Sequence, residues 1–199
     1  KMSIIIKENK VIFINTLGDV TALDTLTGRL LWQLPTQSKS IYEEAMFLKI
    51  SDMVLEDNSV FFSNNMNEFF SLDASTGILN WKQVVNSSLR PSIVNDFIFT
   101  VSEEGFLIVI DSKSGKIIRS TDVFDKFKIK KRKKIKPTGF VLGSKKLYLS
   151  TSTGRLLIVD IETGKTQSII KIDSEKISRP IILKQSLFVV KNNSVIKLN

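Results

Sequence analysis

The sequence contains no cysteine and no histidine, and only 4 proline and 9 glycine residues among its 199. Without cysteine the chain cannot form disulfides, cysteine-based zinc sites or thiol nucleophiles. Without histidine it lacks the commonest acid–base group near neutral pH. Any catalysis by this chain would therefore have to rely on carboxylates, lysine or tyrosine.

Long hydrophobic runs are also missing. The longest unbroken apolar stretch is Phe106–Ile110, whereas a transmembrane helix needs about 20 apolar residues. No charged segment followed by an apolar core opens the chain, so we expect no signal peptide within it. The 42% hydrophobic and 25% charged residues are typical of a globular domain, or of part of a larger one.

The positive charge is concentrated in one segment. The net charge is +9, and eight cations lie between residues 126 and 136, which we call the basic segment. They are Lys126, Lys128, Lys130, Lys131, Arg132, Lys133, Lys134 and Lys136. Removing these eight charges from +9 leaves +1, so the remainder of the chain is nearly neutral. A domain that holds duplex nucleic acid usually spreads positive charge over a whole face.

A five-residue pattern, Asp-x-x-Ser/Thr-Gly, occurs four times in the chain. The copies begin at Asp24, Asp73, Asp111 and Asp160 and end at Gly28, Gly77, Gly115 and Gly164. The pattern predicts a tight turn, because the carboxylate and hydroxyl can accept bonds from nearby amides and glycine tolerates positive φ. The equal position of these carboxylates in each repeat favours a structural role over a catalytic one.

A second regular position lies six residues before each of these aspartates. It holds Gly18, Asn67, Gly105 or Gly154, residue types that suit the left-handed conformation of a hairpin. Successive aspartates are 49, 38 and 49 residues apart, which indicates a unit of 38 residues with insertions at about 37–48 and 125–136. A period of this size with several short strands is typical of a β-propeller blade.

The chain is therefore predicted to be all-β, with four four-stranded blades and three strands of a fifth. The expected blades span residues 3–36, 48–86, 90–124, 137–173 and 177–199. The fourth strand of the last blade has no counterpart in the sequence. We expect it upstream of Lys1, in a larger ring of which this chain is the C-terminal part. Open blade edges also predict self-association.

The segment Gly18–Trp32 closely resembles the quinoprotein-type (PQQ-like) propeller repeat, and Asn67–Trp81 resembles it again. The resemblance implies that Trp32 and Trp81 dock between neighbouring blades. Repeats three and four carry Arg119 and Ser168 at the tryptophan position.

Proteins with such repeats include enzymes and scaffolds. Quinone-dependent dehydrogenases typically carry an adjacent cysteine pair against the cofactor, and this chain has no cysteine. A fragment of such a dehydrogenase stays as an alternative. The chain is more similar to the family of the outer-membrane protein assembly factor BamB, which implies a non-catalytic scaffold without a cofactor.

The resemblance to this family has further implications. It implies an eight-bladed, periplasmic bacterial lipoprotein at the outer membrane. Its partners would be the POTRA domains of a BamA-like protein or nascent outer-membrane proteins. A Leu-Arg pair ahead of a blade contacts the partner in that family, and Leu89-Arg90 matches this pair.

The basic segment has three interpretations. It can be a solvated surface insertion, or it can contact anionic lipid headgroups through Lys128, Lys130, Lys131, Arg132, Lys133 and Lys134. In the second case Phe127 could add anchoring at the membrane interface. We do not expect nucleic-acid binding, because neither an aromatic stacking platform nor a binding helix accompanies the cluster.

Overall fold

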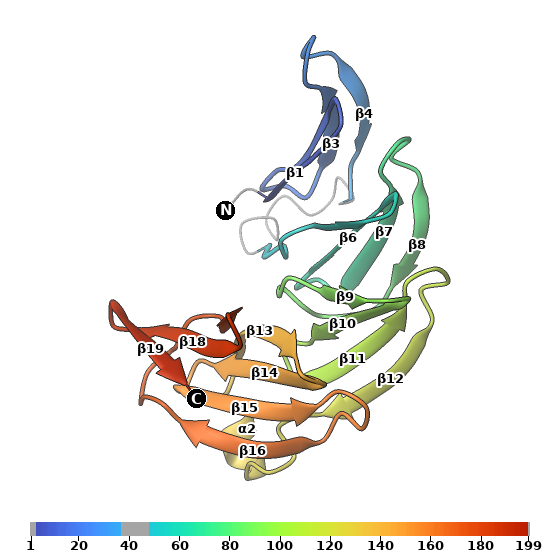
Figure 1. Cartoon of the computed structure of the whole chain (residues 1–199). Coiled ribbons are helices and arrows are strands. Elements are labelled where there is room, and N and C mark those ends of the chain that lie inside the picture. Colours follow the sequence, from blue (N-terminus) through green and yellow to red (C-terminus); the bar gives the residue numbers. More distant parts are fainter. Residues whose placement is uncertain (1–2, 37–47, 199) are drawn as a thin grey trace. The chain divides into compact units, whose positions relative to one another are not determined.

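The computed structural model describes residues 3–36 and 48–198. The insertion predicted at 37–48 lies outside the described residues except for Leu48. The described part is β-structure apart from turns, loops and one helical turn, α2 (Ile129–Arg132), which lies within the basic segment (Figure 1). None of its helices has the length and apolar character needed to cross a membrane.

The strands form five sheets, and within each sheet the strands lie side by side in chain order. The first sheet contains β1 (Ser3–Lys7), β2 (Lys10–Ile14), β3 (Val20–Asp24) and β4 (Leu30–Leu34). The second contains β5 (Val54–Glu56), β6 (Ser59–Asn64), β7 (Glu68–Asp73) and β8 (Leu79–Gln83). The third contains β9 (Ser92–Val94), β10 (Phe97–Val101), β11 (Phe106–Asp111) and β12 (Ile117–Asp122).

The fourth sheet contains β13 (Pro137–Gly143), β14 (Lys146–Thr151), β15 (Arg155–Asp160) and β16 (Thr166–Lys171). The fifth contains β17 (Ile181–Leu183), β18 (Ser186–Lys191) and β19 (Ser194–Leu198). Four sheets of four strands and one of three confirm the all-β propeller architecture predicted from the repeat.

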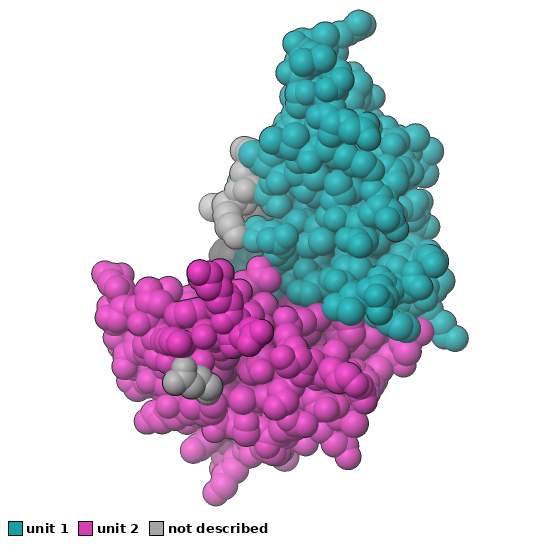
Figure 2. All heavy atoms as spheres, viewed as in Figure 1, with its two compact units in different colours: residues 1–98, 110–116 teal, residues 99–109, 117–199 magenta. Residues whose placement is uncertain are grey.

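The chain divides into two compact units (Figure 2). Unit 1 comprises residues 1–98 and 110–116, and unit 2 comprises residues 99–109 and 117–199. In unit 1, the first two sheets share one core cluster, in which the largest side chains are Phe62, Phe70, Ile12, Ile14 and Leu72. In unit 2, the largest fully buried side chains include Phe124, Phe140, Leu147, Leu149 and Leu156. Burial of each such side chain contributes about 1.5–3 kcal/mol to folding.

In the first four blades, the second and third strands carry most of the core. In β6 and β7, for example, nearly every residue is buried, whereas the fourth strand β8 is exposed or half-buried along its length. Runs such as Val60–Ser63 are buried on both faces, because a blade packs between two neighbours. This explains why these strands are continuous apolar runs without polar alternation.

The two regular positions of the repeat coincide with irregular backbone. Gly18, Asn67, Gly105 and Gly154 all adopt positive φ, which confirms the predicted hairpin position. The pairing register also shifts just before three of the turn aspartates, at Ala22/Leu23, Ser71/Leu72 and Ile158/Val159. Such bulges bend the strand locally, and here each one leads into the Asp-x-x-Ser/Thr-Gly turn.

Candidate functional site

One oxygen of each turn carboxylate, Oδ1, accepts hydrogen bonds within its own turn. Asp24 Oδ1 accepts hydrogen bonds from the Thr27 amide and hydroxyl, each at 2.7 Å. The other three turns repeat this arrangement between Asp73 and Thr76, Asp111 and Ser114, and Asp160 and Thr163, at 2.7–2.9 Å. Each carboxylate serves a different sheet, so the structure does not gather the four into one acidic site.

These bonds lower the pKa of all four carboxyl groups. The Thr27 and Ser114 hydroxyls are the largest cause at Asp24 and Asp111. The Thr76 and Thr163 amides are the largest cause at Asp73 and Asp160. A general acid needs a raised pKa instead, so the chemistry of these groups is that of hydrogen-bond acceptors in turns.

The two tryptophans lie against the turn glycine of the following sheet. A Cβ atom added at Gly77 would meet Trp32 Cε3 at 2.5 Å, and one added at Gly115 would meet Trp81 Cδ2 at 2.6 Å. Trp81 Nε1 also donates to the Ser112 carbonyl at 2.9 Å. Each indole thus ties the fourth strand of one blade to the turn of the next.

Sequence reasoning missed the cations that make equivalent contacts. The Ala74 carbonyl, in the second turn, accepts from Lys10 Nζ at 3.0 Å, while the buried Trp32 Nε1 has no partner among the described residues. In unit 2 the Arg119 guanidinium donates to the Ile161 and Glu162 carbonyls. Arg119 occupies the tryptophan position of its repeat and contacts the next turn, as the tryptophans do. Its position in the repeat was the signal from which this contact could have been inferred.

Leu89 and Arg90 lie in the segment that joins β8 to β9. The Ser87 amide donates to the Asn64 carbonyl at 3.1 Å, and the Leu89 amide donates to Ser87 Oγ at 3.2 Å. Leu89 is half-buried and Arg90 is exposed. The pair is thus presented on a segment that is hydrogen-bonded to the second sheet.

Arg90 is followed by Pro91, and the same Arg-Pro pair recurs as Arg179 and Pro180 before the fifth sheet. The second pair is placed differently. Arg179 Nε donates to the Phe140 carbonyl at 2.9 Å, and a Cβ atom on Gly139 would lie 2.5 Å from Arg179 Cβ. Arg179 is thus packed against the fourth sheet, whereas Arg90 projects to solvent. The two Arg-Pro steps do not share one role.

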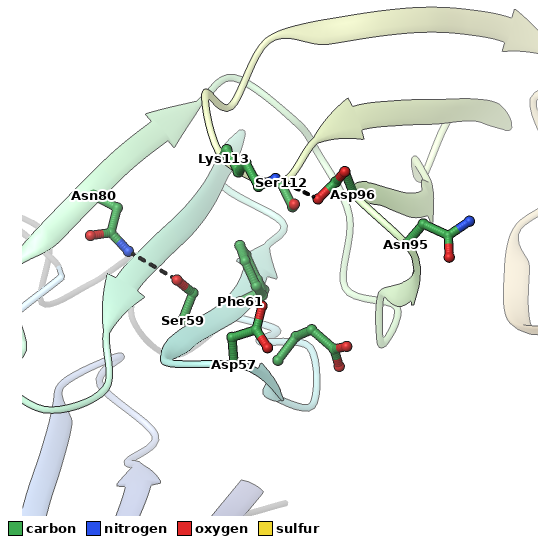
Figure 3. Close-up of a pocket in the computed structure, with 9 residues that line it drawn as sticks. Asp57, Ser59, Phe61, Asn80, Asn95, Asp96, Ser112 and Lys113 are labelled. Carbon is green, nitrogen blue, oxygen red and sulfur yellow. Dashed lines mark hydrogen bonds and ion pairs between the residues drawn. The ribbon is translucent and has the colours of Figure 1, made fainter.

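A polar pocket of 470 Å³ in unit 1 was not predicted from the sequence (Figure 3). Hairpin residues Asp57 and Asp96 and the turn residue Lys113 line it, and Phe61 lies among them. Lys113 Nζ contacts Asp96 Oδ1 at 2.8 Å, which raises the pKa of Lys113. With Asp96 paired, Asp57 and Glu56 make the lining acidic, so the pocket favours cationic over anionic groups.

The pocket and the Leu89-Arg90 pair lie at opposite ends of β9. Leu89 and Arg90 precede this strand, and Asn95 and Asp96, which line the pocket, follow it. The structure therefore does not combine them into one site.

The basic segment is held to the fourth sheet and its neighbours in unit 2. Ile135 is only 4% exposed, the Lys136 amide donates to Ser152 Oγ at 3.0 Å, and the Ser152 amide donates to the Lys136 carbonyl at 2.8 Å. Phe127 is half-buried and meets Phe124 edge-on, with ring centroids 5.9 Å apart. The anchoring role expected for Phe127 therefore does not fit the structure, because its ring packs inward.

Arg132 also departs from its expected role as a surface cation. Its guanidinium contacts Asp122 Oδ2 at 2.5 Å and donates to the Asp125 carbonyl at 2.6 Å, while Nε donates to the Phe127 carbonyl at 2.8 Å. The other five residues expected to contact anions, Lys128, Lys130, Lys131, Lys133 and Lys134, are exposed. Arg132 holds the segment together, and these lysines form its surface.

The fifth sheet has β19 as one of its outer strands and exposes several apolar side chains, including Ile181, Leu183 and Val195. The self-association expected from open blade edges stays a prediction. As for a metal, residues 3–36 and 48–198 hold no group of three or more acidic side chains placed to bind one.

The antiparallel blades, the repeated turns and the residues that dock onto them define the class as a β-propeller of PQQ-like repeats. The sequence model of one family, described as outer membrane protein assembly factor BamB, matches residues 1–121. This is more than half of the chain, and the chain belongs to this family. No curated protein matches the sequence.

Solved structures similar to this chain include a BamB, a computationally designed protein and a β-propeller domain. BamB from Moraxella catarrhalis gives a TM-score of 0.63 at 13% identity, over 98% of this chain and 70% of that one. The computationally designed Ika8 protein gives 0.73 at 14% identity, over 98% and 56%. The Cps50 (Swd1) propeller domain of Myceliophteria thermophila gives 0.71 at 15% identity, over 94% and 60%.

The chain thus spans 56% to 70% of the length of these structures. At such low identities the likeness concerns the fold alone. A fold by itself does not fix a biological role.

Proposed function

We propose that this chain is a non-catalytic scaffold that binds protein partners and serves outer-membrane β-barrel assembly in the manner of BamB. The observation that carries the proposal is the family match over residues 1–121. The structure is compatible with it, because the aspartates that could have supplied acid–base chemistry are engaged in turns. Rigid blades that hold loops in fixed positions are suited to binding.

The segment around Leu89-Arg90 is the contact we propose for the partner. Arginine is enriched among the residues that dominate binding energy at interfaces, and a neighbouring half-buried leucine supplies apolar area. Leu89 and Arg90 offer this combination on a segment that is hydrogen-bonded to the second sheet through Asn64 and Ser87. Little conformational entropy would then be lost when the partner binds.

The proposed partners are the POTRA domains of a BamA-like protein, and the proposed location is the periplasmic side of the outer membrane. Both proposals rest on the family. Nascent outer-membrane proteins are the second class of partner, because an extended chain can add to an exposed strand edge. Competition between POTRA domains and an unfolded barrel protein for this chain would separate the two.

The test is the affinity of the chain for purified POTRA domains, measured by isothermal titration calorimetry. Arg90→Glu should weaken binding at least about tenfold, since loss of a central arginine typically costs 2 kcal/mol or more. Arg29→Glu is the matched control, because Arg29 is also exposed in unit 1 but lies next to the first turn. It should change the affinity by less than about twofold, as expected for a charge outside the contact.

Two results would overturn this proposal. If the unmodified chain does not bind POTRA domains, the partner is wrong. If Arg90→Glu and Arg29→Glu weaken binding equally, the contact is wrong and the effect is general charge repulsion. Unchanged thermal unfolding of both variants ensures that the comparison concerns binding.

A further inference from the structure

We infer that the basic segment is a contact site for anionic lipid bilayers, with the aliphatic side chain of Ile129 entering the headgroup region between lysines. This goes beyond the proposed protein-binding function and depends on other residues. Three features of the segment carry the inference: its attachment to the fold, the removal of its arginine from the surface, and the composition of what remains exposed.

The segment is built into the fold. On the N-terminal side, Phe124 is fully buried and lies so close to Gly105 that an added Cβ would meet the Phe124 ring at 2.1 Å. On the C-terminal side, Ile135 is buried and Lys136 pairs with Ser152 by two hydrogen bonds. Residues 128–134 are therefore attached to the fold on both sides.

Arg132 stabilises the segment from within. It bonds to the Asp122 carboxylate and to the carbonyls of Phe127 and Asp125, so one guanidinium fastens both the approach to α2 and the helical turn itself. Its charge is thereby balanced by Asp122. The cations that remain for an external partner are lysines, whose long stems can lie along a surface while their ammonium groups reach phosphates.

The exposed surface combines cations with one protruding apolar group. Ile129 is 75% exposed and is flanked by Lys128 and Lys130, and the segment from 126 to 136 contains no acidic residue. Polybasic segments are attracted to anionic leaflets, and an aliphatic or aromatic side chain that enters the interface adds to this attraction.

A bilayer fits this surface better than nucleic acid does. Proteins that hold single strands stack bases on aromatic side chains, but the only aromatic residue of the segment, Phe127, packs against Phe124. The Arg155 guanidinium also lies over the Phe127 ring, 5.9 Å from its centre. The exposed apolar side chain of the segment, Ile129, is aliphatic.

The experiment is vesicle flotation with the complete chain. Vesicles of phosphatidylcholine with about 30% phosphatidylglycerol supply the anionic surface, and pure phosphatidylcholine vesicles supply the neutral one. Binding is measured at about 50 mM and about 500 mM salt, because screening weakens contacts between exposed charges. We expect the chain to float with the anionic vesicles at low salt and not with the neutral ones.

Two variants with the same net charge test the location. One replaces the five exposed lysines of the segment, Lys128, Lys130, Lys131, Lys133 and Lys134, by glutamine. The matched control replaces five exposed lysines elsewhere in unit 2, Lys145, Lys165, Lys171, Lys176 and Lys184. We expect the first to weaken binding more than about tenfold and the control less than about threefold, since attraction falls off within a Debye length of the surface.

Ile129→Ser separates a bilayer from other polyanions. It should weaken vesicle binding about threefold and leave the weak binding of a single-stranded oligonucleotide unchanged, since only a bilayer offers an apolar phase. Equal losses of vesicle binding in the two five-lysine variants would overturn the inference, because binding would then depend on the net charge of the chain and not on the basic segment. Oligonucleotide binding as strong as vesicle binding, with no effect of Ile129→Ser, would assign the segment to nucleic acid instead.

Discussion

Replacement of Gly77 by alanine tests how the blades are joined, and Gly28 provides a control of the same local geometry. Both glycines end an Asp-x-x-Thr-Gly turn, and their φ angles are +74° and +71°. A Cβ at Gly77 would lie 2.5 Å from Trp32 Cε3, whereas a Cβ at Gly28 would have nothing within 4 Å. The pair of variants thus separates backbone strain from a clash with the docked indole.

The expected magnitudes follow from these two environments. A left-handed conformation costs an alanine about 1–2 kcal/mol, and this cost is common to Gly28→Ala and Gly77→Ala. The indole ring of Trp32 is rigid, so it can relieve the clash only by moving as a whole. Forced overpacking of this kind adds about 1–3 kcal/mol, so Gly77→Ala should cost about 2–5 kcal/mol in total.

The assay is urea unfolding followed by far-ultraviolet circular dichroism, which does not depend on the tryptophans. A double-mutant cycle with Trp32→Ala completes it. In the Trp32→Ala background the additional cost of Gly77→Ala should fall to that of Gly28→Ala, because the clash partner is gone. The docking is refuted if Gly77→Ala and Gly28→Ala cost the same, or if the extra cost persists without the indole.

Two further predictions concern pH and catalysis. The Lys191 ammonium, which contacts Asp173 Oδ2 at 2.9 Å, lowers the pKa of Asp173 to about 2. A lowered pKa stabilises the fold above the ordinary value of 3.8 and loses its effect as pH falls through about 2. Between these pH values the urea midpoint should fall less steeply in Asp173→Asn than in the unmodified chain, whereas Asp125→Asn, at an exposed residue, should behave like the unmodified chain. The same slope of urea midpoint against pH in both variants would contradict the role given to Asp173. Addition of pyrroloquinoline quinone and calcium should yield no dye-linked alcohol oxidation, and activity above a protein-free blank would overturn the non-catalytic assignment.

The repeat was predictable because its signals are local. The Asp24–Gly28 turn and its three counterparts are each stabilised by bonds between residues two or three positions apart. The hairpin position at Gly18 depends likewise on the residue type at one site. Five-residue signals recurring in phase therefore predicted the blades, whereas the family was inferred from the resemblance of Gly18–Trp32 and Asn67–Trp81 to a known repeat.

The contacts that lysine and arginine make with the turn of the next blade could not be predicted in the same way. Arg119 donates to carbonyls of residues 161 and 162, and Lys10 donates to those of residues 74 and 75. These acceptors are backbone atoms, which any sequence offers, so no residue type marks them. The acidic pocket also escaped prediction, because its lining residues Asp57, Asp96 and Lys113 come from separate turns that lie far apart in the sequence.

The basic segment shows a further difficulty for prediction. Phe127 and Ile129 both interrupt the run of lysines, and the sequence suggested the aromatic residue as the exposed anchor. A single helical turn from Ile129 to Arg132 instead exposes Ile129, while Phe127 packs on Phe124. The sequence pattern also does not show the ion pair between Arg132 and Asp122.

Titration calorimetry with isolated POTRA domains is the most direct measurement of the role assigned to this chain. The account predicts saturable binding that Arg90→Glu disrupts and Arg29→Glu leaves intact. Absence of any heat of binding with the folded, unmodified chain would contradict it.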